Sequence, residues 1–440
     1  MSTFLYMLSK LISLLFTFKG LYTAFVIAIV FYGNLHVFGG VTPRHIATVV
    51  MLATCFAREN RIFINNIILL YLLFIFCFGV SSFVTGYAMK YLTMLLSYFF
   101  VSLVAFWATK ILITRYKGLN FFMILFIVLG VFDGVMTISQ TLGLGIADRL
   151  MQMLHLYSTQ EFMVVLNENR AEDLEYLDSM DDVSDISSNP VGGLSIMMRV
   201  IPGAFSDGVY NGYFLMTTGV MSLMLLAQKL NIVRAIPWVV CAISCICVQE
   251  RGPILILIAL SLYALYKILL SRHVQKSMLS IVITLVSLVV VMRYVYHFVS
   301  SVGSRFAEVG LEDNARENIY SYALEYYLSH PFFGGFFKFN RISPHPPHNL
   351  ILNAFIYGGF VGGLAILMIL YKQFKSIAKT LWGKVNEQNG IHFILALAYI
   401  AFTLNSFLHN KSIVTGEVIV WMLWAAYYFS VKNNQSSYVR

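Results

Sequence analysis

The sequence repeats one feature that limits the folds open to it, namely long apolar runs of the length that a bilayer crossing needs. A transmembrane helix requires about 20 apolar residues, because it rises about 1.5 Å per residue across a hydrocarbon core of about 30 Å. Of the 440 residues, 59% are hydrophobic and only 12% are charged, whereas a soluble protein has about 25% charged residues. The chain is therefore predicted to be an all-α, polytopic membrane protein.

Hydropathy predicts about twelve transmembrane helices, the second of which is short for a crossing. The expected spans are residues 20–38, 43–57, 62–84, 88–110, 119–143, 209–228, 232–249, 252–270, 277–299, 349–371, 391–408 and 413–431. We expect a single integral membrane domain over residues 1–440, with two long loops at 144–208 and 300–347.

The basic residues predict how the chain is oriented in the bilayer. A net charge of +9 would suggest nucleic acid as the partner of a soluble protein, but in a membrane protein Lys and Arg collect in cytoplasmic loops. With both termini in the cytoplasm, 18 of the 30 Lys and Arg residues lie on the cytoplasmic side. This orientation places both long loops outside the cytoplasm, and it leaves the bilayer rather than nucleic acid as the expected partner.

The first long loop is acidic, with eleven Asp or Glu residues against three Arg residues. Ser158 and Glu161 fit a capping box, so a short helix is predicted from there through about Met180. The acidic residues that follow are interpreted as a solvated face or turn.

The second long loop leads into the segment with the most distinctive pattern. Prolines at 344, 346 and 347 exclude helix before His348. His348 and Asn349 are therefore expected at a helix N-terminus, where free N–H groups and the helix dipole favour negative charge. The glycine pairs that follow, at 358–359 and 362–363, predict a close helix contact or a local break.

The segment 316–363 resembles the O-antigen ligase and O-antigen polymerase superfamily. The family pattern is an arginine, an aromatic-rich helix, a Pro-hydrophobic-Gly turn and a His-Asn pair, which here are Arg316, residues 319–328, Pro331 to Gly334, and His348-Asn349. In the ligase-type motif, nine residues follow the His-Asn pair, then Gly, two residues, and Gly, Thr or Tyr. Gly359 and Gly362 complete it here.

A second family feature is an arginine-glycine pair that opens an earlier span, usually after Ser or Thr. Arg251-Gly252 opens the eighth expected span, but Glu250 precedes it, so the match is partial.

The resemblance implies a membrane glycosyltransferase of the GT-C type of architecture, at the periplasmic face of a bacterial inner membrane. Its substrate would be a glycan on undecaprenyl diphosphate, and a chain-length regulator would be a further partner. We favour an O-antigen polymerase, which transfers the glycan to another lipid-linked repeat unit. The related alternative is an O-antigen ligase that transfers it to lipid A core or a protein. A flippase for lipid-linked oligosaccharide is the alternative of a different class.

Sugar transfer from a lipid diphosphate needs a base for the acceptor hydroxyl and cations for the leaving group. His348 is the candidate base, and Arg316 and Arg251 are the candidate diphosphate ligands, because arginine holds phosphate oxygens bidentately. The further substrate-binding candidates are Arg199, Arg305, Arg293 and Asn349. No metal or other cofactor is expected, because no carboxylates show metal-ligand spacing in the outer loops.

Each candidate also has a purely structural interpretation. His348 could be an interfacial residue, and a metal pair with His345 is disfavoured by the two prolines between them. Arg251 could mark the end of a span and pair with Glu250. Arg293 could extend from its span toward the interface. Arg305 and Arg316 could be ordinary loop charges.

Overall fold

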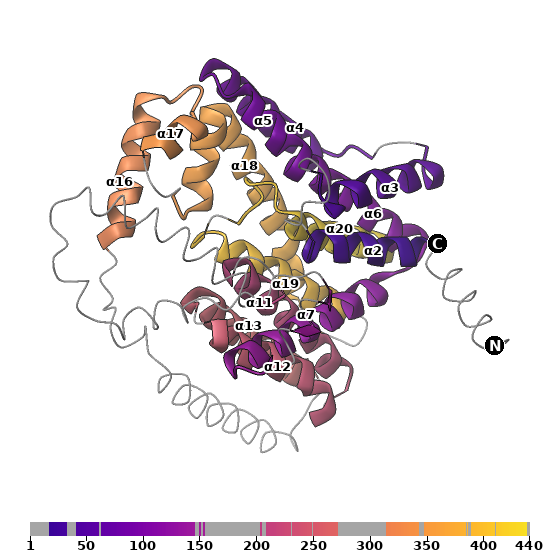
Figure 1. Ribbon diagram of the computed structural model, residues 1–440. Coiled ribbons are helices and arrows are strands. Elements are labelled where there is room, and N and C mark those ends of the chain that lie inside the picture. The colour runs from indigo at the N-terminus through magenta and orange to yellow at the C-terminus, as the bar shows by residue number, and fades with distance from the viewer. Residues whose placement is uncertain are drawn as a thin grey trace, which may run out of the picture. The chain divides into compact units, whose positions relative to one another are not determined.

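In the residues that the structure, a computed structural model, describes, the regular elements are all helices (Figure 1). These are residues 17–32, 41–60, 63–145, 149–150, 153–154, 203–204, 208–229, 231–248, 250–271, 314–342, 347–383, 385, 389–409 and 411–437. The first group of helices is α2 (Phe18–Val30), α3 (Pro43–Arg58), α4 (Asn66–Val84), α5 (Ala88–Met94), the π-helical η1 (Leu95–Phe99), α6 (Phe100–Arg115) and α7 (Leu119–Thr141). The second group is α11 (Gly208–Gln228), α12 (Ile232–Val248), α13 (Arg251–Ser271), α16 (Asn314–Ser329), α17 (Phe336–Ile342), α18 (Leu350–Trp382), α19 (Gly390–Asn405) and α20 (Val418–Ser437).

The helical, apolar character predicted from the sequence is confirmed. Every expected span except 277–299 overlaps a helix, and 277–299 lies outside the described residues. So do most of the first long loop and its predicted helix from Ser158 to Met180. Within the described part of the chain, four helical segments are long and apolar enough to cross a membrane, namely Asn66–Val84, Ala88–Arg115, Leu119–Thr141 and Leu350–Trp382.

The chain divides into two compact units. One unit comprises Met1–Leu125 and Asp313–Arg440, and the other comprises Phe126–Glu312. Helix α7 begins in the first unit and continues in the second.

The core of the first unit is aromatic. Helix α18 packs along α4, and α20 packs along α6. Tyr71 of α4 lies 4.4 Å from Trp421 of α20 between ring centroids, and Phe78 lies 4.8 Å from Tyr357 of α18. Phe336, the first residue of α17, stacks on Tyr357 at 3.8 Å. Aromatic contacts of this kind therefore join α17 to the α4–α18 pair.

The second unit holds a buried carboxyl group in its core. Asp133 of α7 is fully buried, and its Oδ1 accepts a hydrogen bond of 2.8 Å from the backbone N–H of Ala204. Gln140, two turns later on the same helix, exchanges two hydrogen bonds with the backbone of Gly203. Helix α7 thus fixes the short segment 203–204, which gives Asp133 a structural role.

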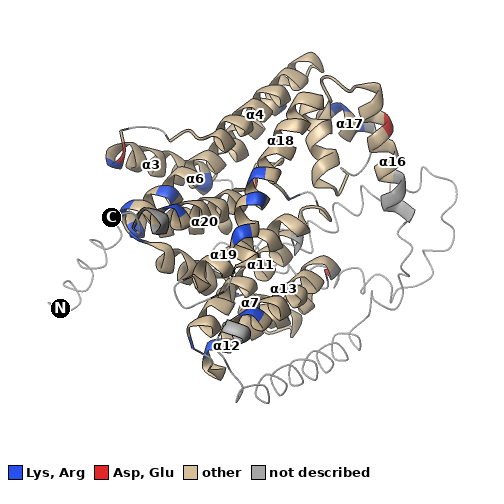
Figure 2. Ribbon diagram, turned by 180° about the vertical axis from the view of Figure 1, so that it is seen from behind, with Lys and Arg blue, Asp and Glu red and all other residues tan. Residues whose placement is uncertain are grey.

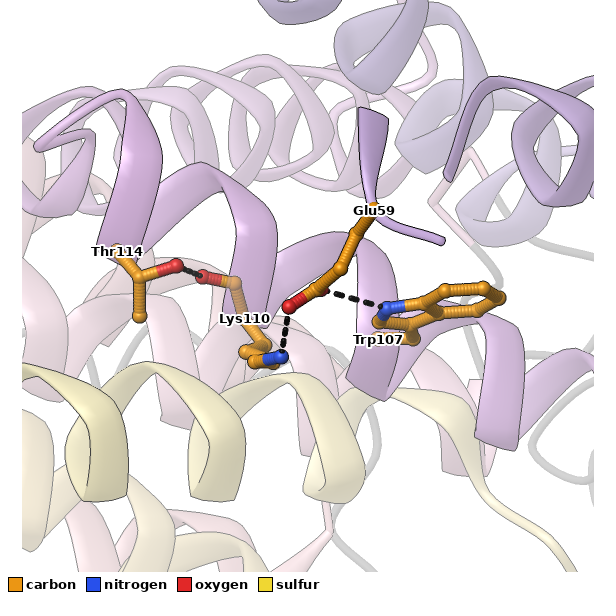
Figure 3. A network of polar contacts seen from close by, with 4 residues as sticks. All are labelled: Glu59, Trp107, Lys110 and Thr114. Atoms are coloured by element: carbon orange, nitrogen blue, oxygen red, sulfur yellow. Dashed lines mark hydrogen bonds and ion pairs between the residues drawn. The ribbon is translucent and has the colours of Figure 1, made fainter. Parts of the chain in front are cut away.

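An ion pair joins the C-terminal end of α3 to α6 in the first unit (Figure 3). Lys110 Nζ lies 2.6 Å from Glu59 Oε1, and the indole N–H of Trp107 donates to Glu59 Oε2 at 3.0 Å. Burial by itself raises the pKa of the Glu59 carboxyl. The hydrogen bonds from Lys110 and Trp107, with the charge of Lys110, outweigh this effect and hold the pKa below its ordinary value.

The ion pair predicts a pH-dependent part of the stability. Because the pKa of Glu59 is lowered on folding, its contribution is fully present above pH 4.5 and is lost as the pH falls through the folded-state pKa. Glu59→Gln should lower the free energy of unfolding by about 1–3 kcal/mol at neutral pH. Thermal unfolding in detergent measures this, with the exposed Glu325→Gln as the control. A difference between wild type and Glu59→Gln that did not shrink toward acid pH would contradict the assignment.

Candidate functional site

The start of α18 is built by the His-Asn pair that the sequence singled out. Asn349 is the N-cap of the helix, and its side-chain oxygen accepts hydrogen bonds of 3.0 Å from the backbone N–H groups of Ile351 and Leu352. An N-cap of this type satisfies amide groups that the first turn leaves without helical partners. Asn349 therefore has a structural role as a cap, and its substrate-binding role stays a prediction.

The backbone around His348 is held from two helices. The hydroxyl of Tyr320 on α16 donates to the carbonyl oxygen of His348 at 3.0 Å. The side-chain amide of Asn353, one turn into α18, donates to the carbonyl oxygen of Pro347 at 2.7 Å. With Asn349 capping the helix directly afterwards, the backbone at the half-buried His348 is held by groups on both sides of it.

Tyr320 and Asn353 were not predicted from the sequence. Asn353 is almost completely buried, with 1% of its surface exposed, and it stands four residues after Asn349 in an apolar helix. A buried polar residue at that spacing was the available signal, because such groups need hydrogen-bond partners. Tyr320 was one of several aromatic residues in α16, so its contact could not be picked out.

Helix α16 also carries Arg316. Its backbone lies one helical turn before Tyr320, and residues four apart share a face of a helix. The side chain of Arg316 lies outside the described part of the structure. Arg316 and His348 are thus brought into the same unit, on two elements that Tyr320 connects by a hydrogen bond.

Helix α18 breaks at Gly359, where φ is 62° and ψ is −163°. The turn that follows α16 docks into this break. The N–H of Gly335 donates to the carbonyl of Ile356 at 2.8 Å, and the N–H of Phe360 donates to the carbonyl of Pro331 at 2.8 Å. Backbone groups on each side of the break therefore find partners in the turn, as buried backbone groups must.

Glycine is required on both sides of this contact. A Cβ at Gly359 would lie 2.1 Å from the carbonyl oxygen of Phe332, and one at Gly334 would lie 2.4 Å from the carbonyl oxygen of Ile356. Both glycines also have positive φ, 62° and 70°. Gly362 instead packs against Phe74 of α4. The spaced residues of the motif thus have three structural roles. Asn349 caps α18, Gly359 is where the helix breaks, and Gly362 is where it contacts α4.

A second histidine lies against His348. The His409 ring is 5.9 Å from the His348 ring between centroids, and the two planes meet at 80°. His409 belongs to the turn after α19 and is half-buried. His409 was not predicted from the sequence. The available signal was the short polar stretch His409 to Ser412 between the last two expected spans.

Charged residues are placed unevenly along α18 (Figure 2). Its first 22 residues, 350–371, contain none, and Lys372, Lys375 and Lys379 occupy its second half. The helix continues beyond the expected span of 349–371 because its lysines are good helix formers. The positive end of the helix dipole at the first turn is therefore the positive element that α18 itself brings to His348.

The remaining predicted site residues are not brought to His348 by the described contacts. Arg251 is the first residue of α13 in the second unit, with its side chain outside the described part. Glu250 packs on α11, since its Oε2 would lie 2.6 Å from a Cβ at Gly212. Four further residues lie outside the described ranges: Arg199, Arg293, Arg305 and His345. In the ranges that are described, no three His, Cys, Asp or Glu residues gather as metal ligands would.

Comparison of the sequence with protein-family models and with curated proteins finds no match. The functional assignment therefore rests on the residues of the site and on the motif that they form.

The docked turn predicts a difference between two glycines with positive φ. Gly359→Ala should destabilise the protein by more than about 2 kcal/mol, because it adds backbone strain and a clash with Phe332. Gly86→Ala is the matched control: its φ is also positive, at 80°, but a Cβ there meets nothing within 4 Å. It should lose only about 1 kcal/mol. Thermal unfolding in detergent measures both, and equal losses would contradict the docking.

Proposed function

We propose that the chain is a membrane-embedded glycosyltransferase of the O-antigen polymerase type, acting at the periplasmic face of a bacterial inner membrane. Its donor is a glycan on undecaprenyl diphosphate, and its acceptor is a second lipid-linked repeat unit. The proposal rests on the motif from Arg316 to Gly362 and on the arrangement of its residues in the first unit.

The observation that carries the proposal is the way His348 is presented. Its neighbours Pro347 and Asn349 and its own carbonyl all make hydrogen bonds that fix the backbone. A backbone that is held closely around a reactive side chain is typical of functional sites, where geometry must be maintained. An interfacial histidine with no chemical role would not require this support from both α16 and α18.

The proposed reaction is a direct displacement at the anomeric carbon of the donor sugar. An oxygen of the acceptor sugar forms the new bond to that carbon, and the bond to the diphosphate oxygen breaks, with its electron pair leaving on undecaprenyl diphosphate. His348 accepts the proton of the acceptor hydroxyl, the role of a general base. Its position before the first turn of α18 places it at the positive end of the helix dipole, which favours the anionic leaving group.

The diphosphate is assigned to arginines. Arg316 of α16, in the unit that contains His348, and Arg251 at the start of α13 are the first choices. Arg199 and Arg305 are the second choices. A guanidinium group keeps its charge and binds two phosphate oxygens at once, so it replaces the divalent metal that many transferases use.

The same site is compatible with the ligase reaction, which differs only in the acceptor. We favour the polymerase because the acidic first loop and the arginine-flanked second loop suit two similar lipid-linked glycans. Purified protein given a lipid-linked repeat unit or lipid A core as the acceptor separates the two reactions. A flippase would move the lipid-linked glycan across vesicles without forming a glycosidic bond.

The base assignment predicts the effect of His348→Ala. This variant should fold and bind the donor but transfer sugar about 100- to 10,000-fold more slowly, the usual loss for a positioned base. His330→Ala is the matched control, since His330 is a half-buried histidine of the same unit whose ring stacks on Tyr326. The measurement is transfer by purified protein, with donor binding scored separately. Transfer by His348→Ala at near the wild-type rate would contradict the assignment.

The arginine assignment predicts a loss that charge alone cannot rescue. Arg316→Lys and Arg251→Lys should each lower transfer by about tenfold or more. Lysine keeps the positive charge but cannot bind two phosphate oxygens at once as a guanidinium group does. Arg341→Lys is the control, since Arg341 lies over the Tyr87 ring instead. Transfer should also survive chelation of divalent ions. Full activity in both lysine variants, or rescue of chelated enzyme by magnesium, would overturn the assignment.

A further inference from the structure

Hydrogen bonds hold the turn between α19 and α20 on both sides of His409. The hydroxyl of Ser406 donates to the carbonyl of Lys411 at 2.7 Å, which closes the turn on both sides of His409. Further along, the hydroxyl of Ser102 on α6 donates to the carbonyl of Gly416 at 2.6 Å. The backbone around His409 is thus tied to α19 at one end and to α6 at the other.

His409 meets His348 edge to face. The ring centroids are 5.9 Å apart and the planes meet at 80°, which is the preferred range and geometry for a pair of aromatic rings. Both rings are half-buried. A ring at this angle restricts how the His348 imidazole turns about its side-chain bonds, so it selects the direction in which the ring nitrogens point.

The contact also has an electrostatic consequence. Two imidazolium charges at a separation of about 6 Å repel each other, so the pair resists being doubly protonated. The polar groups that hold the His348 segment from the packed elements are Tyr320 of α16 and the uncharged Asn349 and Asn353 of α18.

We propose that His409 is a positioning residue of the transfer site that acts through His348: its ring orients the His348 imidazole and disfavours a second positive charge beside it. This inference rests on the proposed function only for its kinetic readout. The physical claim, that His409 controls the orientation and protonation of His348, stands on the contact between the two rings.

The decisive variant is His409→Phe, which keeps an aromatic ring for the edge-to-face contact and removes the titrating group. His348 should then become protonated more easily. In the pH profile of the transfer rate, the fall at acid pH (the acidic limb) should therefore move to higher pH by about one unit. The KM for the lipid-linked donor should stay unchanged. His409→Ala removes the ring as well, so its maximal rate should also fall, by about tenfold. His330→Phe is the matched control and should leave the acidic limb in place.

A second readout does not depend on transfer activity. Diethyl pyrocarbonate modifies neutral imidazole, so its reaction with His348, followed by mass spectrometry across pH, reports the protonation of that ring. In His409→Phe the midpoint should move to higher pH, as in the rate profile. An unchanged midpoint would overturn the role of His409, even if His348→Ala abolishes transfer. The two outcomes can also separate. If the midpoint shifts in His409→Phe but His348→Ala still transfers sugar, the effect of His409 on His348 is supported and the proposed function is overturned.

Discussion

The first unit depends on the contact between a tight turn and a broken helix. Gly335 and Phe360 each donate a backbone hydrogen bond across the break in α18, one to Ile356 and one to Pro331. Unsatisfied backbone groups in an apolar interior cost several kcal/mol each, so a break of this kind persists only where another segment supplies the partners. The docked turn therefore fixes the end of α16 against α18.

That contact has a consequence for chemistry about two helical turns away. With α16 fixed at its C-terminal end by the turn, its earlier residues reach the start of α18, where Tyr320 bonds to the carbonyl of His348. Asn353 and Asn349 hold the same stretch from the α18 side. The parts of the motif that are separate in the sequence thus contact one another in the structure. Gly334 and Gly359 allow the turn after α16 to dock on α18, and this docking places α16 against His348.

Polar groups inside the two units are used in different ways. Asp133 and Gln140 in the second unit hold backbone atoms of residues 203 and 204, so their role is structural. In the first unit, Asn349 and Asn353 likewise bind backbone, whereas the side chain of His348 contacts another histidine. The contrast separates groups that complete the fold from the group to which we assign chemistry.

The sequence by itself determined the helical, membrane type of the chain, the position of nearly every described helix, and the place of His348 before a helix. These follow from apolar run length and from proline and capping preferences, which act over a few residues. It also indicated a break or close contact at the paired glycines. Tertiary packing makes Gly359 the break and Gly362 the close contact. It also brings Tyr320 and His409 to His348, which no sequence pattern predicted. Those contacts join residues far apart in the chain, and their geometry is set by how helices pack rather than by any local pattern.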